Sequence, residues 1–132
     1  MSKTPLIKKL RIQPGHHIMF VNPPPGYIEK LGNLPEGVQI LEGPAVELDF
    51  VQLFVKNIAE LEELAPAAIK SIRYDGLLWV CYPKKSSKVE TDISRDVGWE
   101  VMAENGFRPV TQVSIDETWS ALRFRPTDQV GK

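Results

Sequence analysis

The chain has 132 residues, of which 42% are hydrophobic and 25% are charged, a balance typical of a globular protein that buries an apolar core. The formal net charge is −1, so no overall positive field attracts nucleic acid or an anionic membrane, and any anion site must be local. No apolar run approaches the roughly 20 residues that span a bilayer, and no secretory signal follows the lysines near the N-terminus. We therefore expect a cytoplasmic protein without membrane or nucleic-acid partners.

Short apolar runs predict buried strands at residues 18–21, 50–55 and 77–82, with a shorter candidate at residues 38–41. Turn residues flank these runs, and apolar runs without alternation are typical of strands covered on both faces. The one cysteine, Cys81, lies in the third run, which excludes an internal disulfide and indicates a buried, inert thiol.

Helical patterns separate the predicted strands. Residues 58–72 form one amphipathic pattern, which Pro66 interrupts or restarts. The clearest helix is predicted from about residue 91 to residue 105, because three aliphatic side chains recur at every fourth position: Ile93, Val97 and Val101.

The C-terminal part changes character. Residues 109–114 and 120–125 predict two strands, and the short connection between them requires an antiparallel pair. The preceding alternation of strands and helices predicts a mostly parallel sheet with helices on both faces. We therefore predict one α/β domain over residues 1–132, with its core at about 6–126. Its expected architecture is a three-layer Rossmann-like fold closed by an antiparallel hairpin.

Several segments resemble the class I S-adenosylmethionine-dependent methyltransferases: Ile12-Gln13-Pro14-Gly15 before the first strand, Asp49-Phe50-Val51, Tyr74-Asp75-Gly76-Leu77-Leu78, and Asn105-Gly106-Phe107. The resemblance covers roughly residues 6–126 and implies a truncated version of that fold. One strand–helix unit of the family is missing between Leu41 and Asp49.

Three further segments are similar to a bacterial family of short, methyltransferase-like proteins of unknown function. They are Pro83-Lys84-Lys85-Ser86-Ser87, Thr91-Asp92-Ile93-Ser94-Arg95-Asp96, and the run from Asp116 to Phe124. This second resemblance implies no known activity.

The loop after the first strand departs from the methyltransferase pattern. That family has an acidic residue near the end of the strand and glycines after it, which let the backbone approach the cofactor. Here Phe20 takes the acidic position, Asn22 and Pro24 take glycine positions, and Gly26 is retained. The three prolines at 23–25 also remove three backbone donors. We therefore expect no cofactor, with S-adenosylmethionine as the alternative.

Polar residues after the predicted strands indicate a ligand site, because ligands of open α/β sheets bind at the carboxyl ends of the strands. Lysine and serine side chains before a helix start at residue 91 suit a phosphate or carboxylate, although a solvated lysine loop is the alternative. The predicted anion or ligand site comprises Asn22, Tyr27, Glu42, Lys84, Lys85, Ser86, Ser87 and Arg95. Among these, Glu42 is the candidate acceptor for ribose hydroxyls. Arg95 either forms ion pairs that stabilise the structure or lines the ligand site.

Two functions follow from these observations. The first is a non-catalytic module that binds a small anionic ligand or a protein partner, with a homodimer as one form of partner. The alternative is a small S-adenosylmethionine-dependent methyltransferase with an atypical cofactor loop. No catalytic residue stands out, and His16 and His17 lack the further ligands that a metal site needs nearby in sequence.

Overall fold

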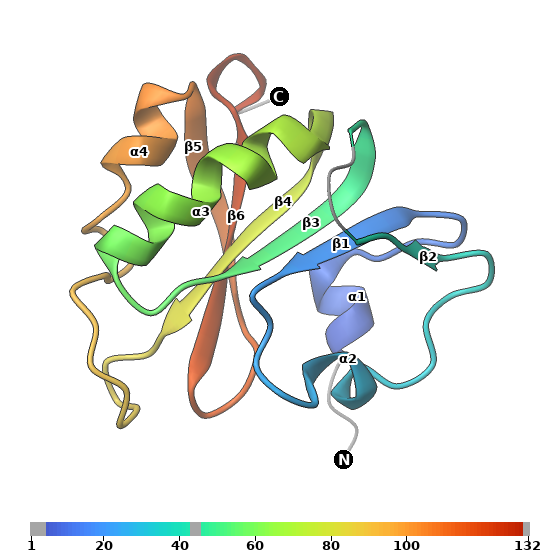
Figure 1. Ribbon diagram of the computed structural model, residues 1–132, viewed down its shortest axis with the longest axis horizontal. Helices are drawn as coiled ribbons and strands as arrows, with labels where there is room; N and C mark the ends of the chain where they lie inside the picture. Colours follow the sequence, from blue (N-terminus) through green and yellow to red (C-terminus); the bar gives the residue numbers. More distant parts are fainter. Residues whose placement is uncertain (1–4, 43–45, 131–132) are drawn as a thin grey trace.

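A six-stranded sheet forms the centre of the molecule in the computed structural model, which describes residues 5–42 and 46–130 (Figure 1). The strands are β1 (His17–Val21), β2 (Gln39–Ile40), β3 (Leu48–Phe54), β4 (Ile72–Pro83), β5 (Phe107–Ser114) and β6 (Trp119–Pro126). Their spatial order is β2-β1-β3-β4-β6-β5. The first four strands pair in parallel, and β6 pairs antiparallel with β4 and β5. The predicted parallel sheet with an antiparallel C-terminal hairpin is therefore confirmed.

Helices cover both faces of this sheet. The short helices α1 (Leu6–Leu10) and α2 (Tyr27–Lys30) pack on one face, and α3 (Ile58–Ser71) and α4 (Glu100–Glu104) on the other (Figure 1). A 3₁₀ turn, Thr127–Gln129, follows β6. No helix of the described residues is long and apolar enough to cross a membrane.

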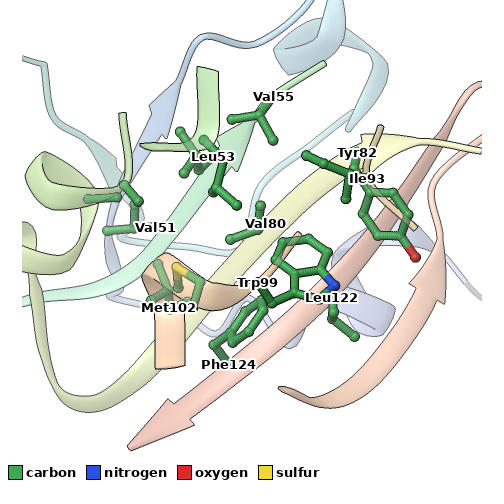
Figure 2. Packing of buried hydrophobic residues seen from close by; sticks show 14 of the residues in the cluster. Val51, Leu53, Val55, Val80, Tyr82, Ile93, Trp99, Met102, Leu122 and Phe124 are labelled. Carbon is green, nitrogen blue, oxygen red and sulfur yellow. The ribbon is translucent and has the colours of Figure 1, made fainter. Parts of the chain in front are cut away.

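Alternating side chains of the central strands build a core on each face. Val51 and Leu53 of β3 face α3, and Figure 2 shows them with other members of that cluster. Phe50 and Phe54 of the same strand face α1 and α2. Trp79 is fully buried on this second face and donates its indole Nε1 to the backbone oxygen of Leu10 at 3.1 Å.

The thiol of Cys81 lies in the second cluster as a buried group. Burial raises the pKa of Cys81 to about 12, although Gln52 Nε2 donates to its sulfur at 3.1 Å and opposes the shift. Almost no thiolate therefore exists at neutral pH, and the prediction of an unreactive thiol is supported.

The predicted helix at residues 91–105 is wrong for most of its length, because α4 begins only at Glu100. Gly98 has φ +107, a left-handed backbone that no regular helix contains. The Ile93 amide donates instead to Thr91 Oγ1 at 3.0 Å, and Val97 is 53% exposed, so the aliphatic side chains do not form one stripe. By contrast, Pro66 lies inside α3, which continues through it.

The connection between β2 and β3 is short. β2 ends at Ile40 and β3 begins at Leu48, so the residues between these two parallel strands are too few for a further strand and its helix. The strand–helix unit that the methyltransferase resemblance would place before Asp49 is therefore missing, as predicted.

Candidate functional site

The carboxyl ends of β1 and β3 meet at one edge of the sheet, and Asn22 joins them. Its amide Nδ2 donates to the backbone oxygen of Phe54 at 3.0 Å and to Glu60 Oε1 at 3.4 Å. Asn22 has φ +59 and Gly26 has φ +77, so both adopt left-handed backbone. Asparagine tolerates this conformation, which glycine adopts without steric cost. The loop therefore keeps two glycine-like turns although it has only one glycine.

Side chains already satisfy the first amides of α3. Asn57 caps the helix, since its Oδ1 accepts from the Glu60 amide at 2.8 Å. Glu60 Oε1 accepts from the Lys56 amide, and Asp92 Oδ1 accepts from the Ile58 amide, both at 2.8 Å. A ligand anion at this helix start would have to replace these carboxylates.

Tyr27 and Glu42 lie apart from the lysine loop, residues 83–88. Tyr27 is 3% exposed, and its hydroxyl donates to Gln52 Oε1 at 3.0 Å inside the α1–α2 core. Burial raises the pKa of this phenol far above its usual value, so it stays protonated. Glu42 is exposed just beyond β2, whose pairing with β1 extends through the Leu41 amide to the backbone oxygen of Ile18. Two strands, β1 and β3, separate β2 from β4 and the lysine loop.

The lysine loop follows β4 and is hydrogen-bonded to the β5–β6 hairpin. Lys84 Nζ donates to Ser114 Oγ at 2.6 Å, and its amide donates to the backbone oxygen of Thr118 at 2.7 Å. Ser87 turns back, with its hydroxyl donating to the backbone oxygen of Lys84 at 2.7 Å. Because the next helix begins only at Glu100, the loop does not meet a helix start near residue 91, and the prediction that helix amides there contribute to an anion site is wrong.

Two open clefts flank this loop. The first, of about 750 Å³, is lined by Asn57, Lys85, Ser87, Lys88, Val89, Glu90, Thr91 and Asp92. The second, of about 610 Å³, is lined by Tyr82, Lys84, Lys85, Ser86, Ser94, Arg95, Asp96, Gln112 and Ser120. The second cleft thus brings together four residues of the predicted site, while Ser87 lies in the first and Lys85 borders both.

The floor of the second cleft contains residues that the sequence analysis missed. Tyr82 and Ser120 are partners in the register of β4 and β6, and they are 4% and 5% exposed. Burial raises the pKa of Tyr82; Arg95 opposes this shift, whereas Asp96 adds to it. Tyr82 could have been suspected because it is the last residue of an apolar strand run, where a polar end reaches the ligand edge. Ser120 carries no such signal.

The described residues hold no group of three or more His, Cys, Asp or Glu side chains placed to bind a metal ion.

No sequence-family profile matches the chain, and no curated protein matches it in sequence. Solved structures do match it. A SAM-dependent methyltransferase from Aquifex aeolicus superposes with a TM-score of 0.57 and 13% identity, over 90% of this chain and 86% of that chain.

Two further structures give the same result. Ribosomal protein L11 methylase from Lactobacillus delbrueckii subsp. bulgaricus has a TM-score of 0.59 and 13% identity, over 91% of this chain and 74% of that one. A putative type 11 methyltransferase from Sulfolobus solfataricus has a TM-score of 0.54 and 10% identity, over 96% and 92%.

The expectation of no cofactor is corrected by these neighbours, because one with the same fold is a SAM-dependent methyltransferase and the other two are a methylase and a putative methyltransferase. The site itself is compatible with such a ligand. Asn22 and Gly26 have glycine-like backbone geometry, and a Cβ added at Gly26 would meet no atom within 4 Å, so there is open space at that residue. The chain has the Rossmann-like fold of S-adenosylmethionine-dependent methyltransferases.

Proposed function

We propose that this protein is a small S-adenosylmethionine-dependent methyltransferase with an atypical cofactor loop. The observation that carries the proposal is the left-handed geometry of Asn22 and Gly26 after β1; an exposed carboxylate, Glu42, follows the neighbouring strand β2. In open α/β sheets a nucleotide-type ligand lies across such strand ends. The shared fold supports this function over the non-catalytic binding module that was our first expectation.

Each element of the edge has a distinct task in this proposal. Glu42 accepts hydrogen bonds from the ribose hydroxyls, and the loop from Asn22 to Gly26 lies against the methionine portion. Pro23, Pro24 and Pro25 offer no backbone donors there, so we expect the adenosine half to contribute most of the affinity. When bound, S-adenosylmethionine supplies an activated methyl group for transfer to a nucleophile.

Glu42→Gln tests the ribose contact. We expect S-adenosylhomocysteine to bind the wild type in an isothermal titration and to bind the variant on the order of tenfold more weakly, since a hydrogen bond to a charged acceptor is lost. Glu36→Gln is the matched control, because Glu36 is an exposed acid in the connection before β2 and should leave the affinity unchanged. Equal affinity in all three proteins, or no binding by the wild type, would contradict the proposal.

The resemblance to the short bacterial family stays a prediction, as does a protein partner or homodimer. Light scattering across a concentration series tests the homodimer, and a constant monomer mass would contradict it.

A further inference from the structure

The floor of the second cleft contains two polar side chains. Tyr82 and Ser120 lie more than nine-tenths buried on adjacent strands, and both line the cleft. Within the described residues neither hydroxyl makes a hydrogen bond. Neither hydroxyl oxygen is fully buried, in contrast to Arg123 Nε, so both can be reached from the cleft. Figure 2 shows the Tyr82 hydroxyl directed away from the aliphatic side chains around Val80. Two hydroxyls of buried residues are therefore free to bind a ligand, although buried polar groups normally have a partner.

The position of the floor is fixed by packing. The Tyr82 ring packs edge-on against Trp99 with ring centroids 5.4 Å apart, and the Trp99 indole donates to the backbone oxygens of Ser94 and Arg95 at 2.9 and 3.0 Å. The segment that carries Arg95 is thereby held over the floor. Lys84 is held at the rim by its hydrogen bond to Ser114.

The charge of the cleft is positive. Lys84, Lys85 and Arg95 line it with one carboxylate, Asp96. The Arg95–Asp96 pair is long, at 3.6 Å, and its side chains are 67% and 85% exposed, so it neutralises little. Although the net charge of the chain is −1, the cleft is a local concentration of positive charge next to uncharged hydroxyl donors.

The donors in the cleft suit a phosphate better than a carboxylate. Hydroxyl groups come from Tyr82, Ser86, Ser94 and Ser120, in addition to the lysine and arginine donors. The three terminal oxygens of a phosphate can accept hydrogen bonds from more of these donors than the two oxygens of a carboxylate can. The volume of about 610 Å³ falls in the range of small-molecule sites.

We propose that this cleft binds the phosphate group of a small-molecule ligand, with Tyr82 and Ser120 as floor donors and Arg95 and Lys85 as counter-charges. Lys85 also lines the first cleft, which reaches Asn57 at the start of α3, beside the strand ends where the cofactor is proposed to lie. The ligand is accordingly the methyl acceptor, a phosphate monoester. This acceptor role rests on the proposed methyltransferase function, whereas the phosphate site does not.

The test uses inorganic phosphate as the probe, titrated against chloride at equal ionic strength and followed by thermal melting and calorimetry. We expect saturable binding to the wild type. Arg95→Gln and Tyr82→Phe should each weaken it on the order of tenfold, because each removes one donor to a charged ligand. Tyr82→Phe keeps the ring that packs on Trp99, so its loss of binding cannot be attributed to lost packing.

Arg108→Gln is the matched control, since Arg108 is exposed on β5 and does not line the cleft. Phosphate affinity in this variant should equal that of the wild type. Absence of saturable phosphate binding, or the same affinity in Arg95→Gln and Tyr82→Phe as in the wild type, would overturn the site.

The two proposals fail independently. Glu42→Gln should retain phosphate binding and lose S-adenosylhomocysteine affinity, and Arg95→Gln should show the opposite. Phosphate binding by a protein that binds no S-adenosylhomocysteine would leave the site in place and overturn the acceptor role.

Discussion

Arg123 is a side chain whose surroundings oppose its charge. It lies on β6 between Trp79 of β4 and Thr111 of β5 and is 8% exposed, and its buried Nε has no hydrogen-bond partner among the residues that the structure describes. Burial lowers the pKa of its guanidinium, and the nearby charges of Arg11 and Arg125 lower it further. Asp75 would be the natural partner, but both of its oxygens accept hydrogen bonds from Arg125.

Arg123→Met should therefore stabilise the protein. Methionine has a similar length and no charge to desolvate, so we expect the free energy of unfolding to rise by about 1 kcal/mol. Urea unfolding measures the change, and Arg108→Met is the control at an exposed position of β5. A loss of stability in Arg123→Met beyond that of the control would show that the guanidinium has a favourable role.

At the scale of elements, Asp116 joins the β5–β6 hairpin to α2. Its Oδ1 accepts from the amides of Thr118 and Trp119 at 2.8 Å each, and its Oδ2 accepts from Lys30 Nζ at 2.8 Å. Burial disfavours the ionised form, but these hydrogen bonds outweigh it and hold the pKa of Asp116 below its usual value.

Substitutions at Asp116 separate the turn from the ion pair. Asp116→Asn keeps an oxygen for the two amides and loses a partly exposed ion pair, so it should cost less than about 1 kcal/mol. Asp116→Ala loses the amide acceptors too and should cost about 1–2 kcal/mol. Urea unfolding measures both, and equal costs would contradict the role of the turn.

The stability difference between wild type and Asp116→Asn should depend on pH, because the pKa of Asp116 differs between the folded and unfolded states. A carboxyl whose pKa is lowered by folding contributes stability above its unfolded pKa, near 4, and this contribution is lost as the pH falls through the folded value. The stability difference between wild type and Asp116→Asn should therefore be full at neutral pH and vanish in acid. A difference that grew on acidification would contradict the assignment.

The strands could be predicted from the sequence because continuous apolar runs have few other structures available. The helix at residues 91–105 could not, because Ile93, Val97 and Val101 have helical spacing while Gly98 takes a backbone that ends any helix. A glycine within such a pattern is compatible with a helix and with a turn, and its φ is decided by tertiary packing around Ile58 and Ile93.

The candidate site was only partly predictable for a similar reason. Lys84, Lys85, Ser86 and Arg95 converge as a group, but Tyr82 and Ser120 become neighbours only through the register of β4 with β6. That register depends on contacts between segments distant in sequence, which no local pattern encodes.

At the scale of the whole molecule, the order β2-β1-β3-β4-β6-β5 places every proposed ligand contact at one edge. The parallel strands β1, β2, β3 and β4 end there, and β6 begins beside the end of β4, where Pro83 pairs with Trp119. Loss of one strand–helix unit leaves this edge in place. The proposed cofactor contacts and the phosphate cleft therefore occupy neighbouring parts of the same edge.

A titration of the isotope-labelled protein with S-adenosylhomocysteine, followed by its amide resonances, tests whether the cofactor binds at this edge of the sheet. We predict saturable shifts at Asn22, Gly26 and Glu42, with the amides of the distant amino edge, such as Gly37, unchanged. An absence of shifts at millimolar ligand, or shifts confined to the cleft around Arg95, would contradict the proposal that this protein binds the methyltransferase cofactor at the ends of β1 and β2.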